Sequence, residues 1–581
     1  MSELSSHTAS VVSDEKVTRS VRCMVLAVFA AILALRVLFV IHYRIDSDEP
    51  QHLHVVWGWT HHLVQYRDLF DNHTPLFHLA CTPLLLLVGE RADALIFMRF
   101  AMVPLFFFSL WCVWRLGVII KSAEVGLWAA VFAALSPAFC FTFTEFRTDD
   151  LWTAFWLWSL VVLLGGPPTA KRGFVTGLLF GAAVATSLKT LALLGCLAVA
   201  AIVGLVLAGT FKTALTDRKS GPFLAALLAG CALIPGLLLL WFAKQHALHD
   251  ALFGIFTYNS VPGLGRIRLL RDFIIGLLQL LGTIALLIPF SAWMARRLIA
   301  PQNHLRFHLV FLGSGFYGAL IYTLWPLLDA EHFIPFHPLM VLGFMPLLID
   351  TLARPPRLRP VTLRHALLAA VAFAVMAWEA TFVRLNAALG DINHYADLLR
   401  LSNPSDYIMD LKGETTFLQR PYRFLFEGVG VVRAKKDLMP DTVPEDMIRT
   451  RTCIALRHNW RFIFPRAIAF MDENYISVGA YRVLGHPMTA AAENHGYTFH
   501  VVIPQTFAFV TAGNVVRGTI DGQPCQGFAT LTEGTHEFLP ARPKTQVDFV
   551  WKQAIDRGFF PVAQKLAPPP RPLSKSRNHS A

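Results

Sequence analysis

Apolar runs about as long as a membrane is thick alternate with short polar segments over the first two-thirds of the chain. A helix needs about 20 mostly apolar residues to cross a bilayer. Eleven runs come close to this length: 22–42, 94–114, 123–143, 151–165, 174–189, 190–209, 222–243, 273–295, 307–328, 333–351 and 366–385. The segment 74–89 is short and contains two prolines, so we predict an interfacial or re-entrant helix there. The pattern therefore predicts a polytopic α-helical membrane protein.

The distribution of Lys and Arg predicts the orientation of these helices. With a cytoplasmic N-terminus, 14 Lys and Arg occur in the 51 residues of the short inside loops, 115–121, 166–173, 210–221, 296–306 and 353–365. Only 9 occur in the 101 residues of the outside segments, 43–91, 144–150, 186–191, 244–272 and 329–338. The basic density is about threefold higher inside, as the positive-inside rule requires, and a full span at 74–89 would destroy this agreement. The odd number of spans places the C-terminal region outside.

The two ends of the chain differ in character from the membrane part at 22–385. Residues 1–21 are polar and rich in serine, which predicts a short disordered cytoplasmic tail. Residues 386–565 are predicted to form a mixed α/β extracytoplasmic domain, and 566–581 a disordered tail. Strand-like stretches occur at 475–485, 500–512, 515–525 and 528–538, with an Asp-Gly turn at 521–522 and a helical pattern at 444–460.

Composition agrees with a membrane protein and argues against other classes. Of the 581 residues, 55% are hydrophobic and 15% charged, whereas a soluble protein carries roughly 25% charged residues. The net charge of +12 is explained by basic inside loops, so we expect no nucleic-acid partner. Six of the eight cysteines lie in or beside apolar runs. Cys453 and Cys525 lie in the polar C-terminal part, and the sequence leaves their pairing open.

The outer end of the first apolar run carries a dense cluster of ionisable residues. The stretch RIDSDEPQHLH contains Asp46, Asp48, Glu49, His52 and His54 and begins the outer loop 43–91. One interpretation is purely structural, because acidic residues followed by proline are typical of the first turn of a helix. The other is a functional site, and the remaining outer loops favour it.

Carboxylates and cations recur in the later outer loops. Glu145, Arg147, Asp149 and Asp150 occupy 144–150, and Asp329, Glu331, His332 and His337 occupy 329–338. Lys189 lies at the outer end of an apolar run, where a lysine is costly and indicates function unless it merely extends to the membrane surface. This composition suits a ligand with an anionic head and an apolar tail. The cations would bind a phosphate, and a partly desolvated carboxylate would remove a proton from a nucleophile.

Several motifs, in their order and spacing, resemble membrane glycosyltransferases of the GT-C superfamily that use lipid-phosphate sugars. The most similar groups are the protein O-mannosyltransferases and the lipid A aminoarabinose transferases. DSDE at 46–49 resembles their Asp-Glu signature, and HTPL at 73–76 resembles their His/Lys-x-Pro-Leu stretch. Arg99 and the Gly-rich GLLFGAAVATSLKTLALL, which contains Lys189, match by position. Gln51-His52 and His332-Phe333 depart from the basic residue and the Arg-Tyr pair that relatives carry there.

The resemblance implies inverting sugar transfer from a polyprenyl phosphate at the outer face of a bacterial cytoplasmic membrane. Carried over by position, Asp48 is the general base, and Glu49 orients the acceptor or Asp48. The donor's phosphate and sugar would be bound by Lys189, His73, Arg67, Arg147, Asp149 and His332. The acceptor would be a glycan, a lipid or a protein, and this branch of the superfamily generally works without a metal ion.

Two further interpretations stay open at this stage. Asp48 and His52 are spaced i,i+4, which leaves a divalent metal as an alternative. A transporter or flippase of a lipid-linked sugar would place ionisable residues near the membrane midplane. Most of them lie at the outer ends of spans instead, with Arg36 as the main exception. A metal-dependent hydrolase is disfavoured because no HExxH motif occurs.

Overall fold

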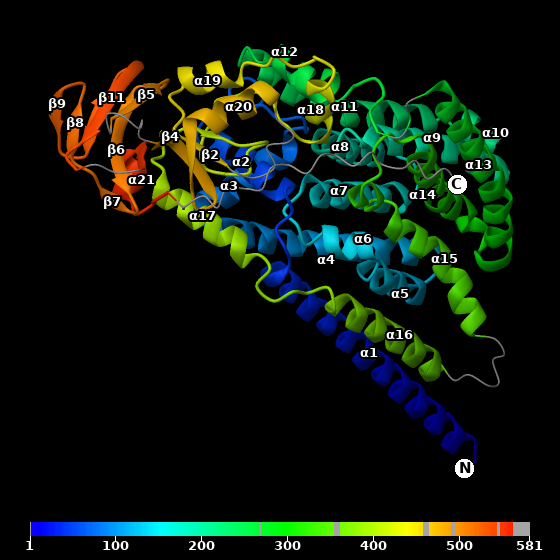
Figure 1. Ribbon diagram of the computed structural model, residues 1–581. Helices are drawn as coiled ribbons and strands as arrows, with labels where there is room; N and C mark the ends of the chain where they lie inside the picture. Colours follow the sequence, from blue (N-terminus) through cyan, green and yellow to red (C-terminus); the bar gives the residue numbers. More distant parts are fainter. Residues whose placement is uncertain are drawn as a thin grey trace. The chain divides into compact units, whose positions relative to one another are not determined.

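The computed structural model (Figure 1) describes residues 2–265, 267, 269–353, 361–456, 464–489, 496–542 and 546–561. The chain divides into two compact units. The helical unit comprises Met1–Leu399, Lys412–Phe417 and Arg423–Met439, and the second unit comprises Arg400–Leu411, Leu418–Tyr422 and Pro440–Ala581. The chain therefore alternates between the units over 400–440, whereas the sequence analysis places a single boundary near 386. The predicted tail 566–581 lies outside the described residues.

Helix α1 (Ser2–His42) is longer than the sequence predicts. Its apolar part, Val21–His42, is a candidate membrane span. The helix begins at Ser2, within the stretch for which the sequence analysis expects a disordered tail. Once an apolar span has nucleated a helix, each added residue gains one hydrogen bond without a new nucleation cost.

Six further helices of the described residues are long and apolar enough to cross a membrane. They lie in α4 (Ala94–Ile120), α9 (Thr190–Leu207), α11 (Ser220–Lys244), α13 (Leu270–Leu298), η2–α14 (Pro301–Asn303 and His304–Leu324) and α16 (Val361–Ala380). The chain is thus a multi-pass membrane protein with seven candidate spans among the described residues. In Figure 1, α16 runs alongside α1.

The other four predicted spans fall on shorter helices. They are α5 (Ala123–Ala134) with α6 (Pro137–Thr142), α7 (Thr148–Leu164), α8 (Ala170–Thr186) and α15 (His337–Leu352). A continuous helix over 123–143 is wrong, since Ser136 is extended and Pro137 opens a new helix. The segment 74–89 forms the 13-residue helix α3 (Leu76–Val88). The helical unit also contains α2 (Asp48–Thr60), α10 (Phe211–Thr216), α12 (Leu248–Leu252), η1 (Phe253–Thr257), η3 (Ala330–Phe333) and α18 (Gly428–Ala434), and α17 (Leu389–Leu401) ends at the boundary between the units.

Small residues allow α8 and α11 to approach very closely. A Cβ atom added at Gly177 would overlap the carbonyl oxygen of Leu227, and one at Gly230 would overlap that of Phe174. Close backbone contact through glycine is the usual way in which membrane helices gain packing energy. The Gly-rich segment is therefore a helix–helix interface, and it leads directly to the turn that carries Lys189.

The second unit contains two sheets. The larger has the order β1-β2-β4-β12-β6-β10, with β3 on β4 and β7 on β6, and the smaller has the order β5-β11-β8-β9. Only β1 and β2 pair in parallel among the named strands. The strands are β1 (Ile408–Met409), β2 (Ile454–Leu456), β3 (Tyr475–Val478), β4 (Tyr481–Thr489), β5 (Tyr497–Val501), β6 (Gln505–Thr511), β7 (Asn514–Val515), β8 (Gly518–Ile520), β9 (Gln523–Cys525), β10 (Phe528–Leu531), β11 (Gly534–Pro540) and β12 (Gln546–Trp551).

The four predicted strand stretches of this unit all contain strands, and three helices, α19 (Val443–Arg449), α20 (Pro465–Asn474) and α21 (Lys552–Asp556), accompany them. Asp521 and Gly522 have φ of 50° and 79° and form the tight turn between β8 and β9, as predicted. The helical expectation for 444–460 holds only for α19, because β2 follows it and 457–460 lie outside the described residues. Cys453 and Cys525 are both buried free thiols.

Candidate active site

The first turn of α2 positions the acidic side chains of the cluster. The Asp46 carboxylate accepts a hydrogen bond from the backbone N–H of Asp48 at 3.2 Å, and the backbone N–H of Asp46 donates to Glu49 Oε1 at 2.8 Å. Ser47 makes no side-chain cap. Asp46 therefore caps the helix, and the Asp48 carboxylate instead contacts residues that are distant in the sequence.

Glu49 lies behind this turn in a buried ion pair with Arg99 of α4. Arg99 Nε donates to Glu49 Oε2 at 2.7 Å, and neither side chain is exposed. The same oxygen accepts the backbone N–H of Phe146 at 2.8 Å, and Arg99 also donates to the carbonyl oxygens of Tyr43 and Arg44. Glu49 thus fixes three segments relative to one another. Its expected role in orienting the acceptor stays a prediction, and its contacts are those of a positioning residue.

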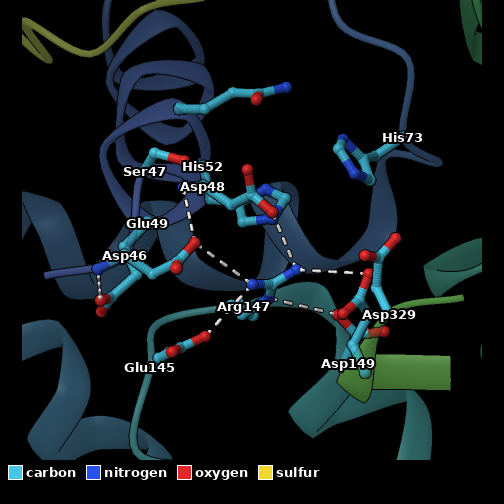
Figure 2. A network of polar contacts seen from close by, with 12 residues as sticks. Asp46, Ser47, Asp48, Glu49, His52, His73, Glu145, Arg147, Asp149 and Asp329 are labelled. Atoms are coloured by element: carbon cyan, nitrogen blue, oxygen red, sulfur yellow. Dashed lines mark hydrogen bonds and ion pairs between the residues drawn. The ribbon is translucent and has the colours of Figure 1, made fainter. Parts of the chain in front are cut away.

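Arg147 occupies the centre of the cluster (Figure 2). Its side chain is only 10% exposed, and its guanidinium lies within ion-pair distance of five carboxylates. These are Asp48 at 2.8 Å, Glu145 at 3.1 Å, Asp46 at 3.4 Å, Asp149 at 3.6 Å and Glu331 at 3.8 Å. The structure therefore brings together residues from three outer segments that the sequence analysis could only place on the same side of the membrane.

Asp48 is held by two cations, one on each carboxylate oxygen. Arg147 Nη2 contacts Oδ2, and Lys412 Nζ contacts Oδ1 at 2.5 Å while also reaching Ser47 Oγ at 3.1 Å. Burial favours the neutral acid, but Arg147 and Lys412 outweigh it and hold the pKa of Asp48 well below its usual range. Asp48 is therefore ionised at physiological pH. Sequence reasoning missed Lys412, which lies 364 residues away in a polar segment with no motif around it.

Lys189 lies in the turn between α8 and α9, at the N-cap position of α9. Its Nζ is 3.4 Å from Asp149 Oδ1 and 5.5 Å from the ring centroid of Trp152. Burial raises the pKa of Asp149, but Lys189 and Arg147 outweigh burial, so that pKa is lowered. The Lys189 side chain is 25% exposed, which leaves its ammonium group accessible to a ligand.

Asp71 holds the imidazole of His73, which lies beside the cluster in Figure 2. Asp71 Oδ1 lies 3.1 Å from His73 Nδ1 and accepts a hydrogen bond from Gln51, which keeps the buried carboxylate in place. Burial lowers the pKa of the His73 imidazole, but the Asp71 carboxylate outweighs it and raises that pKa. The rings of His73 and His52 lie 4.7 Å apart, and Figure 2 shows His73 across from Asp48 and above Arg147.

The last two predicted donor-binding residues differ in placement. Arg67 is 41% exposed, pairs with Asp68 and donates to the Gln245 carbonyl oxygen, and its described contacts do not reach the Asp48–Arg147 cluster. His332 Nδ1 lies 3.7 Å from Glu331 Oε1, and burial, followed by Lys189, lowers the pKa of His332 to about 3. Ligand atoms of Asp329, Glu331 and His332 lie within 4.8 Å of one another, so these three residues are able to hold a divalent ion.

One of the acids around Arg147, Glu145, favours the protonated form near neutral pH. Burial, opposed by Arg147, raises the pKa of Glu145 to about 8, and burial also raises the pKa of Glu331. A neutral Glu145 lowers the negative charge around Arg147. The remaining carboxylates in contact with Arg147 face the cations Arg147, Lys189 and Lys412. A neutral Glu145 thus makes it easier for the cluster to accept an anion.

Arg36, a charged residue within the first span, supports the segment that precedes Glu145. It donates to the Cys140 carbonyl oxygen at 2.6 Å and to Thr144 Oγ1, and its guanidinium lies 4.0 Å from the Phe106 ring centroid. These contacts fix the end of α6 immediately before Glu145. Arg36 therefore anchors the loop that presents Arg147.

The fold of the chain is similar to that of solved GT-C membrane glycosyltransferases. ArnT from Cupriavidus metallidurans, in the apo state and bound to undecaprenyl phosphate, matches with a TM-score of 0.50 and 12% identity, over 79% of this chain and 97% of ArnT. This match confirms the predicted resemblance at the level of fold.

Two other solved structures are also similar. The arabinofuranosyltransferase AftD from Mycobacteria matches with a TM-score of 0.40 and 14% identity, over 90% of this chain and 40% of AftD. The Archaeoglobus fulgidus oligosaccharyltransferase matches with 0.42 and 10%, over 75% of this chain and 69% of that one. No family model and no curated protein matches the sequence.

Removal of one partner of the Glu49–Arg99 pair should destabilise the protein strongly. Arg99→Met leaves a buried carboxylate without its cation, which costs about 3–5 kcal/mol. The double variant Arg99→Met/Glu49→Leu should recover part of this loss, because an apolar pair is tolerated where an unpaired charge is not. Thermal unfolding in detergent, followed by tryptophan fluorescence, measures both. Arg91→Met, which breaks a pair whose arginine is 51% exposed, is the control and should cost about 0–1 kcal/mol. A double variant as unstable as the single one would contradict this account.

Proposed function

We propose that the chain transfers a sugar from a polyprenyl-phosphate-linked donor to an acceptor at the outer face of the bacterial cytoplasmic membrane. One observation carries the proposal: the ionised Asp48 carboxylate contacts the cations Arg147 and Lys412, and Lys189 is held next to them by Asp149, in a chain with a GT-C fold. The undecaprenyl phosphate bound to ArnT supports a lipid donor of this kind. The proposal includes the eleven crossings, the cytoplasmic N-terminus and the external C-terminal domain that the loop charges predict.

In the proposed reaction, Asp48 accepts the proton of an acceptor hydroxyl group as that oxygen bonds to the anomeric carbon of the sugar. The bond from this carbon to the phosphate oxygen breaks, and polyprenyl phosphate leaves as an anion. Attack opposite the leaving group inverts the anomeric centre. Lys189, His73 and Arg147 stabilise the developing phosphate charge, so no acid has to protonate it. Asp149 holds Lys189, and His332, neutral at physiological pH, offers a hydrogen bond to the sugar. The contacts of Arg67 lend no support to the donor role expected for it.

An apolar cavity of about 470 Å³ suits the isoprenoid tail of the donor. It is lined from α5, α6 and α15 by Phe132, Pro137, Met340, Val341, Phe344 and Leu348. His337 opens α15 at this cavity, four residues after Phe333 ends η3. Since η3 carries Glu331 and His332, the cavity lies close along the chain to the polar cluster, as a lipid with an anionic head requires.

Asp48→Asn should abolish sugar transfer without weakening the binding of undecaprenyl phosphate. The amide keeps the size of the side chain but cannot accept the hydroxyl proton. Envelope glycans and lipids of cells that lack the chain, complemented with wild type or the variant, are compared by mass spectrometry. Binding of undecaprenyl phosphate to the purified proteins is measured in parallel. Asp217→Asn, an exposed aspartate, is the control. Wild-type products in the Asp48→Asn cells would remove Asp48 from the role of base.

We further propose that transfer requires no divalent metal, because Arg147, Lys189, Lys412 and His73 already supply positive charge to the phosphate. Transfer by purified protein in detergent should then be unchanged after treatment with EDTA. Loss of activity with EDTA and its recovery with Mg²⁺ or Mn²⁺ would instead assign a metal. The same assay on His332→Ala would then show whether the ion is held by Asp329, Glu331 and His332.

Binding of undecaprenyl phosphate should weaken as the pH rises from about 7 to about 9. The pKa of Glu145 is raised to about 8 by burial, so Glu145 loses its proton in this range, and the raised pKa of His73 extends its protonated form toward higher pH. Every such loss makes the site more negative and repels the phosphate. His73→Gln should bind more weakly near pH 7 and show a flatter profile, whereas His61→Gln, at the far end of α2, should match wild type. A wild-type affinity that increases with pH would be inconsistent with these assignments.

A further inference from the structure

Both oxygens of the Asp48 carboxylate are occupied by cations in this structure. Arg147 Nη2 lies 2.8 Å from Oδ2, and Lys412 Nζ lies 2.5 Å from Oδ1. A carboxylate that is paired on both oxygens is a weak base and has little room to approach a substrate hydroxyl group. One of the two cations has to move before Asp48 is able to remove a proton.

Arg147 is the cation that stays in place. Its guanidinium is shared among five carboxylates, so a movement away from Asp48 would break several contacts at once. Among the described residues of the helical unit, Lys412 donates to two groups, Asp48 and Ser47 Oγ, and Glu427 lies near enough to interact with its charge. Lysine is a point charge on a flexible four-carbon chain and is able to exchange one oxygen ligand for another nearby.

The segment that carries Lys412 is tightly held over the first turns of α2. His54 Nδ1 donates a hydrogen bond to the carbonyl oxygen of Thr416, with 2.7 Å between the two atoms, and Phe417 packs into the apolar cluster of Leu53, Val56 and Phe146. Gly413 has a φ of +91°, and a Cβ there would press on the His54 ring. Thr416 has a φ of 59°, which is unfavourable for a β-branched residue. Such a backbone conformation persists only where surrounding contacts impose it. Here these contacts keep the backbone of Lys412 beside Asp48.

We propose that Lys412 is a phosphate-binding residue of the donor site that rests on Asp48 until the donor arrives. This inference rests on the proposed function. When the phosphate enters among Lys189, His73 and Arg147, the Lys412 ammonium moves from Asp48 Oδ1 to a phosphate oxygen. The move adds a cation to the leaving group and frees Asp48 Oδ1 for the acceptor hydroxyl group. Proton removal by Asp48 is thereby linked to the presence of the donor.

The test measures the affinity for undecaprenyl phosphate of wild type, Lys412→Met, Asp48→Asn and the double variant. Lys412→Met should weaken binding about tenfold, since a charge-assisted hydrogen bond is lost. Lys412→Arg should restore most of the affinity. The loss caused by Lys412→Met should be larger in the Asp48→Asn background, because Lys412 no longer has to leave a carboxylate before it binds the phosphate. Lys435→Met, at an exposed position just after α18, is the matched control and should bind as wild type does.

The outcomes separate this inference from the proposed function. A wild-type protein that does not bind undecaprenyl phosphate would overturn the proposed function. If wild type binds it and Lys412→Met binds equally well, or if its effect is smaller in the Asp48→Asn background, the inference is overturned and the proposed function stands. Thermal unfolding of each variant in detergent identifies any that do not fold, and where Lys412→Met does not fold, Lys412→Gln, which keeps a polar side chain but removes the charge, carries the test. A loss of affinity of about tenfold in Lys412→Gln then supports the inference, and wild-type affinity in Lys412→Gln overturns it.

Discussion

Arg147 holds together carboxylates that would otherwise repel one another. Asp46 and Asp48 come from the corner between α1 and α2, Glu145 and Asp149 from the loop before α7, and Glu331 from η3. In a poorly hydrated site, acids this close together would be driven to the neutral form. The planar guanidinium meets several of them at once and keeps Asp48 and Asp149 ionised. Arg147 is itself placed by the neighbouring residue, because the Phe146 N–H is bound by Glu49, which Arg99 fixes in turn.

The cations at the site have two opposing effects on Asp48, one on its ionised form and one on its strength as a base. The cations that keep Asp48 ionised also make it a weaker base, since they stabilise the carboxylate that must accept a proton. A reaction with an anionic leaving group tolerates this compromise, because the same cations stabilise the departing phosphate. The movement of Lys412 would remove part of the conflict, since it shifts one positive charge from the base to the leaving group at the moment when both effects are useful.

The N-terminal ends of α2 and α7 carry acidic residues of the site. Asp48 and Glu49 lie in the first turn of α2, and Asp149 in the first turn of α7, where the helix dipole stabilises negative charge. Close glycine contacts between α8 and α11 hold α8 in place. The turn at the end of α8 then places Lys189 beside Asp149. The polar cluster is thus built on helix ends, while the long apolar helices supply the membrane anchor.

The sequence by itself determined the membrane character of the protein, the position of its main apolar helices and the polar segments between them that carry charge. Each of these follows from local composition, because a bilayer demands long apolar runs and leaves the charged residues in the connecting segments. It also indicated Asp48, Arg147 and Lys189, since ionisable residues beside apolar spans are costly without a purpose.

Only the tertiary structure decided which of these residues meet. Arg67 and His73 lie six residues apart, yet His73 approaches the cluster while Arg67 pairs with Asp68 at the surface. Glu49 was placed beside Asp48 by sequence, but its helix turns it toward Arg99, because adjacent residues of a helix face different directions. Lys412 could not be found at all, since its contact with Asp48 spans 364 residues and depends on the path of a loop. Ion pairs of this kind are set by long-range packing, for which local sequence patterns carry no signal.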